Sequence, residues 1–171
     1  MPENKITYNP KIAGRFRGYL PIVIDVETGG LNPATDALLE IAAVTVNCDA
    51  QGVFYPAETI AHHIEPFTGA VLNPDSLAIN KIDPSHPFRF ALQEQDALEQ
   101  IFKFLQAAQK QANCNRCVLV GHNAWFDLAF LNAAINRSKI KRNPFHGFTC
   151  FDTATLGALM YGQTVLAEAL K

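Results

Sequence analysis

The chain has 171 residues, of which 49% are hydrophobic and 18% are charged, a composition that suits one ordinary globular domain. Its net charge is −2, so a nucleic-acid partner would have to be recognised locally, by the distribution of the 14 lysines and arginines. No stretch approaches the roughly 20 apolar residues of a membrane span, and the first ten residues lack the apolar run of a secretory signal. We therefore expect a single domain over residues 1–171, located in the cytoplasm and without a membrane partner.

Four cysteines are too few and too irregularly spaced for a disulfide scaffold in a chain of this length, so we expect reduced thiols. They are Cys48, Cys114, Cys117 and Cys150. Cys114 and Cys117 have the spacing of a zinc or redox pair, but the sequence contains no second pair of this kind. An ordinary structural role is therefore favoured for both.

The first half of the chain predicts three strands. Residues 19–26 form a short apolar run rich in branched side chains, and residues 37–46 follow a turn-rich loop. Residues 59–66, preceded by Phe54, alternate between apolar and polar side chains. The first four residues of the second segment suit a helix as well as a strand. Because the connections are short, we expect the three strands to form an antiparallel meander.

The second half predicts helices around one further strand. A proline-rich stretch has room for a short helix near residues 75–79, and residues 93–111 repeat apolar side chains at helical spacing. Residues 117–121 suit a buried strand, residues 127–136 a helix, and residues 165–171 the start of another helix without a glycine or asparagine cap. This order predicts an α/β fold with a mixed central sheet, flanking helices and a fourth strand reached by a helical crossover.

Two acids near the end of the first strand are candidates for a metal site. Asp25 and Glu27 lie two residues apart, so their carboxylates point to the same face of the sheet. Such a pair next to the apolar residues 22–24 is costly to bury unless a cation or hydrogen-bond donors offset the charge. Taken alone, the pair is also explained by a strand end that faces solvent.

Two motifs resemble those of the DEDD superfamily of 3′→5′ exonucleases. Residues 25–31, Asp-Val-Glu-Thr-Gly-Gly-Leu, followed by Leu-Glu-Ile-Ala at 39–42, are similar to its first motif. His-Asn-Ala-Trp-Phe-Asp at residues 122–127 has the His-Asn-X-X-Phe-Asp form of its second. Asp127 also falls in the first turn of a predicted helix, where a carboxylate meets the positive end of the helix dipole and can project toward the first strand.

The resemblance implies an RNase H-like fold in which Asp25, Glu27 and Asp127 bind metal. Ligands that offer only oxygen select Mg²⁺ or Mn²⁺. The superfamily implies two Mg²⁺ ions per active site, one that activates water and one that stabilises the leaving 3′ oxygen. The products implied are 5′-mononucleotides.

Within the superfamily, the chain is most similar to the ribonuclease T family, and the similarity runs along essentially its whole length. Matching segments include residues 15–18, 35–41, 142–146, 151–153 and 162–166. The resemblance implies trimming of the 3′ tails of tRNA and other structured RNAs by a homodimer, in which a basic patch grips RNA across from the partner's active site. The residues that match this patch are Arg15, Arg17, Lys110, Arg116 and Lys141. The alternative is that these charges have no role in RNA binding and only form a solvated surface.

The family also clamps terminal bases between aromatic rings, and two of these match as Phe126 and Phe148. The other two positions hold Leu31 and Ile79, so aliphatic contacts replace part of the stacking. Because base–aromatic stacking contributes about 1–3 kcal/mol per base, we expect the preference for the terminal base to differ from that of the family. Phe126 also suits a plain core position.

The superfamily pattern includes a fourth acid and, five residues before it, a general-base histidine. After Asp152 the only acid is Glu168, and no histidine follows His146. Asp152 itself suits a helix N-cap before Thr153. We therefore expect no catalytic general base within the sequence, and a truncated domain whose histidine lies beyond Lys171.

Three functions are compatible with these features. The first is an exoribonuclease whose full-length form is active with Mg²⁺. The second is an RNA-binding module without turnover, which would bind RNA tightly and in a salt-sensitive manner. The third is an exonuclease of the proofreading type that acts on DNA, with single-stranded DNA as its partner.

Overall fold

The computed structural model of the chain describes residues 6–171. Residues 1–5, which begin the stretch where we expect no secretory signal, lie outside the described residues. In chain order the elements are α1 (Lys11–Arg15), β1 (Tyr19–Thr28), β2 (Leu38–Cys48), β3 (Phe54–His63), α2 (Pro74–Asn80), α3 (Glu94–Gln111), β4 (Arg116–Gly121), α4 (Ala124–Arg137), β5 (Phe145–Asp152), α5 (Thr153–Tyr161) and α6 (Leu166–Ala169).

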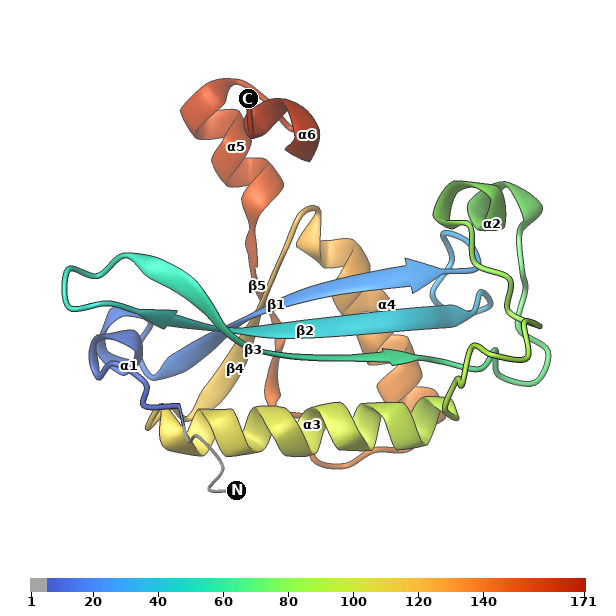
Figure 1. Ribbon diagram of the computed structural model, residues 1–171, viewed down its shortest axis with the longest axis horizontal. Coiled ribbons are helices and arrows are strands. Elements are labelled where there is room, and N and C mark those ends of the chain that lie inside the picture. Colours follow the sequence, from blue (N-terminus) through green and yellow to red (C-terminus); the bar gives the residue numbers. More distant parts are fainter. Residues whose placement is uncertain (1–5) are drawn as a thin grey trace.

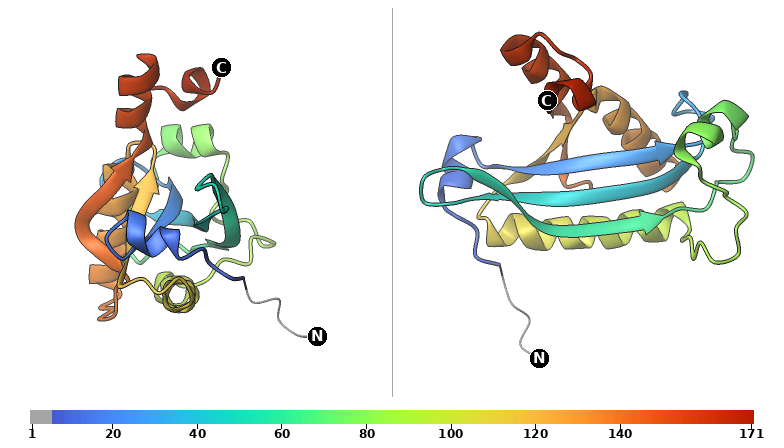
Figure 2. Two further views of the ribbon diagram at one scale, coloured as in Figure 1. Left: turned by 90° about the vertical axis from the view of Figure 1, so that its left-hand side faces the viewer. Right: turned by 45° about the horizontal axis from the view of Figure 1, so that its top comes forward.

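The strands form one mixed sheet in the order β3-β2-β1-β4-β5 (Figure 1). β1 to β3 pair antiparallel, whereas β4 runs parallel to β1 and β5 runs parallel to β4. The chain reaches β4 through α3, and α5 and α6 stand apart from the sheet beyond the end of β5 (Figure 2). The predicted α/β fold, with an antiparallel meander followed by a helical crossover, is confirmed.

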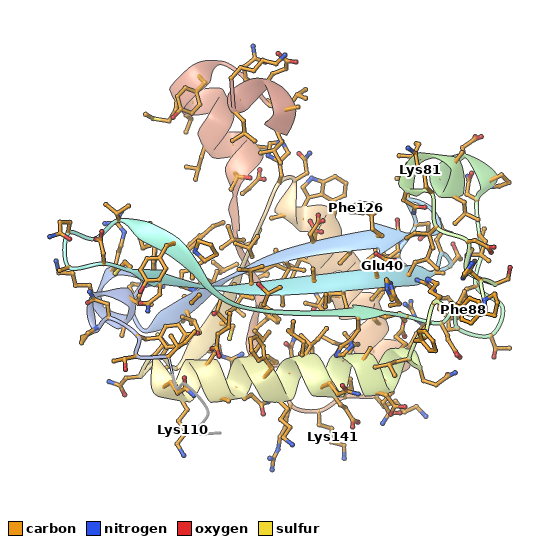
Figure 3. All side chains as sticks on the ribbon, in the orientation of Figure 1. Glu40, Lys81, Phe88, Lys110, Phe126 and Lys141 are labelled. Atoms are coloured by element: carbon orange, nitrogen blue, oxygen red, sulfur yellow. The ribbon has the colours of Figure 1, made fainter. Side chains whose placement is uncertain are left out.

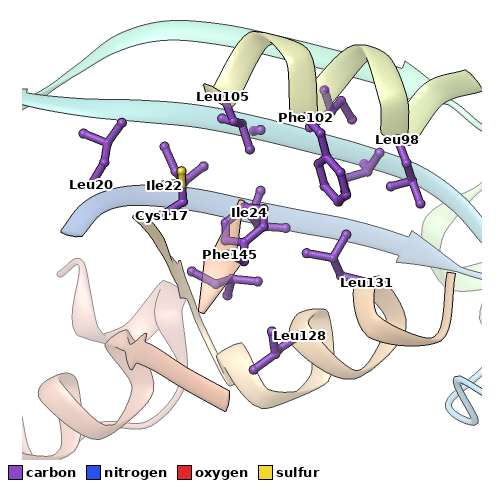
Figure 4. Close-up of a cluster of buried hydrophobic side chains, with 14 of the residues drawn as sticks. Leu20, Ile22, Ile24, Leu98, Phe102, Leu105, Cys117, Leu128, Leu131 and Phe145 are labelled. Atoms are coloured by element: carbon purple, nitrogen blue, oxygen red, sulfur yellow. The ribbon is translucent and has the colours of Figure 1, made fainter. Parts of the chain in front are cut away.

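One face of β1 is buried and the other is open. Along the strand, Ile22 and Ile24 are buried, whereas Val23 and Asp25 are exposed, as the period of two in a strand requires. The buried face packs against α3 and α4, whose apolar side chains gather around Ile22 and Ile24 (Figure 4). The acids of β1 therefore lie on the open face.

The apolar spacing of α3 explains how it covers the sheet. Leu98, Ile101, Phe102 and Leu105 are all buried in the core cluster, at the three-and-four spacing that forms one helix face. Lys103, on the opposite face, is exposed. The predicted helix over residues 93–111 is confirmed.

Three elements were not predicted, each for a physical reason. α1 has only five residues and is held by the fully buried Ile12. The pairing of β5 with β4 is interrupted between Phe145 and Cys150. The segment therefore lacks the alternation of apolar and polar side chains that identifies a regular strand. α5 carries apolar residues on all sides and therefore shows no helical stripe. In addition, α4 begins at Ala124 rather than at residue 127.

The expected unpaired thiols are confirmed, because all four cysteines are free. Burial raises the pKa of Cys114 to about 11 and that of Cys117 to about 12. Thiols with such values stay protonated at neutral pH and are poor metal ligands and nucleophiles. Among residues 6–171, no helix combines the length and apolarity needed to cross a membrane.

Replacing Leu98 by alanine should destabilise the fold. Its side chain is fully buried between α3 and the sheet, and removal of a buried leucine side chain costs about 2–5 kcal/mol. Urea denaturation, monitored by circular dichroism, measures the decrease in the free energy of unfolding. Lys103→Ala, on the exposed face of the same helix, is the control and should change the free energy of unfolding by less than about 0.5 kcal/mol. Equal decreases in the two variants would contradict the assigned core.

Candidate active site

Asp25, Glu27 and Asp127 lie near one another where β1 ends and α4 begins. Asp25 and Glu27 lie on the open face of the sheet, as their spacing predicts. Asp127 is buried, and its Oδ1 accepts a hydrogen bond of 3.1 Å from the backbone N–H of Val26, between the two acids. This bond fixes the first turn of α4 against β1.

Burial and the repulsion of neighbouring acids disfavour the charged forms of Asp127 and Glu27. The pKa of Asp127 is raised to about 6, first by burial and further by the negative charges of Asp25 and Glu27. The pKa of Glu27 is raised by burial and by its neighbours Asp25 and Glu40. In the described part of the chain, no lysine or arginine forms an ion pair with the three acids. Because a divalent cation relieves such repulsion, the donor set fits Mg²⁺ or Mn²⁺.

The acids do not form a closed set of ligands by themselves. Within residues 6–171, no group of three or more histidine, cysteine or acidic side chains is arranged to hold a metal ion. A bound ion would therefore have to draw the carboxylates of Asp25, Glu27 and Asp127 closer together.

Glu40 is a further acid at the site that was not predicted as a site residue. It pairs directly opposite Glu27 in the antiparallel ladder of β1 and β2. Both line a shallow cleft on the open face together with Asp25 and His63, and Glu40 Oε1 accepts a hydrogen bond of 2.7 Å from Nδ1 of His63. Figure 3 shows Glu40 toward the end of the sheet that carries α2. Only the register of the hairpin brings it there, and register follows from the pairing of whole strands.

Asp152 holds the turn that precedes α4. Its Oδ1 accepts hydrogen bonds from the backbone N–H groups of Asn123, at 2.8 Å, and Ala124, at 3.3 Å. The same side chain caps α5, as predicted. Asp152 thus occupies the amide groups at the start of α4 and supports the turn that carries Asp127.

Three of the predicted base-contacting residues lie on segments close to the acids. Phe126 is half-buried and adjoins Asp127. Leu31, on the loop after β1, and Ile79, in α2, are 80% and 82% exposed. The side chain of Asn80 donates a hydrogen bond of 3.0 Å to the carbonyl oxygen of Thr28, which ties α2 to the end of β1.

Phe148 lies elsewhere. It is 82% exposed, on the part of β5, residues 146–149, that bulges out of the ladder. Through β4, this bulge is level with residues 20–22 of β1, before Asp25 in the strand. Within one chain, the structure does not bring Phe148 together with Phe126.

The predicted basic patch gathers residues from separate segments. All five of its members are exposed, namely Arg15, Arg17, Lys110, Arg116 and Lys141. The first four lie where β1 and β4 begin, because Tyr19 of β1 pairs with Arg116. Lys110 and Lys141 project from the side of the molecule that carries α3, away from Phe126 (Figure 3). At about 3.3 Å per residue, Asp25 is about 20 Å along β1 from this end.

Comparison with known proteins agrees with the fold. A protein-family model described as "Exonuclease" matches residues 22–171. Crystal structures of E. coli exonuclease I with dT13 and with dA16 oligonucleotides superpose with a TM-score of 0.64, at 18% identity, over 84% of this chain. The chain spans 30% of the length of those chains. At this identity the likeness shows the fold alone, which is that of the RNase H-like exonucleases.

Relatives with similar sequences show which family of exonucleases the chain belongs to. Ribonuclease T of Cronobacter sakazakii is 56% identical over 158 residues, which cover 92% of this chain and 71% of that protein. Ribonuclease T of Vibrio parahaemolyticus is 58% identical over 158 residues, covering 92% of this chain and 74% of that protein. The chain belongs to the ribonuclease T family of the DEDD exonuclease superfamily.

Without a divalent cation, the charge on Asp127 should destabilise the folded protein as the pH rises. An ordinary aspartate titrates near 3.8, and Asp127 in the fold near 6, so the folded state holds the extra proton between these values. Above about pH 6 the penalty is complete. In EDTA, Asp127→Asn should therefore raise the free energy of unfolding by about 1–3 kcal/mol at pH 8 and hardly at all below pH 4.

Urea denaturation at the two pH values measures this difference. Asp96→Asn, at an exposed position of α3, is the control and should show no gain at pH 8. Lower stability of Asp127→Asn at pH 8 would contradict the burial penalty.

Proposed function

We propose that the protein is a divalent-metal-dependent 3′→5′ exoribonuclease that trims the 3′ tails of tRNA and other structured RNAs and releases 5′-mononucleotides. The observation that carries this proposal is the hydrogen bond that fixes the buried Asp127 to Val26, between Asp25 and Glu27, with no lysine or arginine paired to the three acids in the described chain. It occurs in a chain that is 56% and 58% identical to two proteins named ribonuclease T. A cytoplasmic location, consistent with four free cysteines, is part of the proposal.

The three acids would hold Mg²⁺ or Mn²⁺, with two ions at the complete site. When bound, the metal supplies Lewis-acid stabilisation of the charge that develops on the phosphate during hydrolysis. The hydrogen bond from Val26 fixes the Asp127 carboxylate, which would therefore determine where the metal is held. Phe126, Leu31 and Ile79 would contact the terminal bases, the latter two through aliphatic side chains. The chain spans 71% and 74% of the length of the two relatives.

The basic patch would hold the RNA backbone upstream of the cleaved end, most effectively in a homodimer. It lies about 20 Å along β1 from the acids, and two of its lysines project from the α3 side, away from Phe126. In a dimer, the patch of one copy can face the acids of the other. Phe148, which is exposed and distant from Phe126 in one chain, would also act across such an interface.

Single-stranded DNA is the alternative substrate. The exonuclease I structures that share the fold contain DNA oligonucleotides, but they are only 18% identical to this chain. The ribonuclease T relatives, at more than half identity, favour RNA. Competition between RNA and DNA tails of equal length separates the two substrates.

The activity is tested with the protein as its gene encodes it and a 5′-labelled RNA hairpin that carries an unpaired 3′ tail. In Mg²⁺ we expect stepwise shortening of the tail and release of mononucleotides, and in EDTA neither. Asp127→Asn should lower the rate by at least about 100-fold, which corresponds to about 3 kcal/mol of transition-state stabilisation. Asp96→Asn is the matched control and should retain full activity. Absence of mononucleotides in both Mg²⁺ and Mn²⁺ would contradict the proposal.

The role of the basic patch predicts a change in salt dependence. Replacing Arg15 and Arg17 together by alanine should weaken RNA binding and lower the slope of log Kd against log salt by about 0.7 for each phosphate that the variant no longer neutralises. Fluorescence anisotropy of a labelled RNA between low and high salt measures the slope. Lys171→Ala removes an exposed lysine that pairs with Glu168 and should leave the slope unchanged. An unaltered slope in the arginine variant would mean that these charges only line a solvated surface.

A further inference from the structure

Trp125 is the only tryptophan of the 171 residues, and it is 66% exposed near the start of α4. Tryptophan contributes most when its large ring is removed from water, which is why it is concentrated in cores and at binding surfaces. An indole left two-thirds exposed in the helix that carries Asp127 therefore points to a ligand.

The ring of Trp125 contacts one aromatic side chain, which in turn packs on a second. Trp125 lies edge-to-face with Phe126, with ring centroids 6.0 Å apart and an interplanar angle of 89°. Phe126 in turn packs on the fully buried Phe130 at 4.9 Å. In an edge-to-face pair at most one face of the indole is covered by its neighbour, so at least one face remains available for stacking.

The position of Trp125 on the helix decides which part of a ligand it can reach. Residues two apart on a helix point in different directions, so the indole does not share the side of α4 from which Asp127 contacts β1. It adjoins Phe126, which is next to Asp127 in the chain and packs on the fully buried Phe130. A nucleotide whose phosphate is at the acids would thus meet Phe126 first and Trp125 further along the strand.

The charges around this end of α4 favour a base over a phosphate. The backbone N–H groups of Asn123 and Ala124, which could otherwise bind a phosphate, already donate to Asp152. The carboxylate of Asp152 also repels a phosphate group. The face of a neutral base has no such penalty, and every base has a π face that can stack on an indole.

We propose that Trp125 is a substrate-binding residue that stacks on an unpaired base of the RNA 3′ tail, next to the base that Phe126 contacts. This inference rests on the proposed exoribonuclease function and deepens it. It adds an aromatic subsite to the three base-contacting side chains near the acids.

Fluorescence provides the direct test. With the protein as its gene encodes it, in EDTA to prevent turnover, titration with a single-stranded RNA tail should quench tryptophan emission. The quenching should saturate with the Kd found by anisotropy of the labelled RNA. Trp125→Phe, which keeps a stacking ring but lacks the indole, should bind the labelled RNA within about 3-fold of the wild type when measured by anisotropy.

Trp125→Ala separates binding from structure. Without one stacked base, tail binding should weaken about 5- to 100-fold, and KM should rise while kcat changes little. Because stacking releases no counterions, the slope of log Kd against log salt should stay the same. Phe88→Ala removes a comparably exposed ring, 74% exposed, in the loop between α2 and α3 (Figure 3), and should bind the tail as the wild type does.

The outcomes distinguish the two proposals. If the wild type releases mononucleotides but Trp125→Ala binds and trims with unchanged Kd and KM, the inference is overturned and the proposed function stands. If Trp125→Ala alters the oligomeric state, measured by light scattering, at unchanged RNA affinity, the ring belongs to a protein interface and the inference is likewise overturned. If the wild type neither binds tails nor releases nucleotides, both proposals fail.

Discussion

The hydrogen bond from the backbone N–H of Val26 to Oδ1 of Asp127 joins the two halves of the site. It links β1, which carries Asp25 and Glu27, to the first turn of α4. Since α4 also packs its apolar side chains into the core beneath β1, the bond fixes a carboxylate on a rigid element. Acids contributed by segments that are far apart in the sequence therefore lie at one place in the fold.

Without a bound cation, this cluster of acids lowers the stability of the folded protein. Burial is the largest cause of the raised pKa of Asp127, and its two acidic neighbours add to it. Glu40, opposite Glu27, brings more negative charge to the same cleft. Groups placed for binding commonly destabilise the fold that holds them, and the large apolar core under α3 and α4 offsets this cost.

Much of the fold was predictable from the sequence, because β1 and β2 are apolar runs rich in branched residues and α3 repeats apolar residues at helical spacing. β5 was not predictable, since its pairing is interrupted between Phe145 and Cys150. The earlier start of α4 depends on tertiary contacts, because Asn123 adopts a left-handed conformation with φ 62° and its N–H donates to Asp152. Local propensity contains no information about such a contact.

The site was predictable to a similar degree. The spacing of Asp25 and Glu27 predicts that both lie on one face of β1, as they do, and the second motif gives Asp127 as a third candidate ligand. Glu40 required the register of β1 and β2, and the basic patch required the parallel pairing of β1 with β4. Trp125 stands within the motif, but its exposure depends on what covers α4 in three dimensions.

Thermal unfolding in increasing concentrations of Mn²⁺ tests most directly whether the acids form a metal site. A ligand that binds only the folded state raises its stability by RT ln(1 + [L]/Kd). We predict that Tm rises with Mn²⁺ at pH 8 and rises much less at pH 5, where Asp127, with a pKa of about 6, is largely protonated. A Tm that does not respond to Mn²⁺ at pH 8, or that responds equally in Asp127→Asn, would contradict a metal site built on these acids.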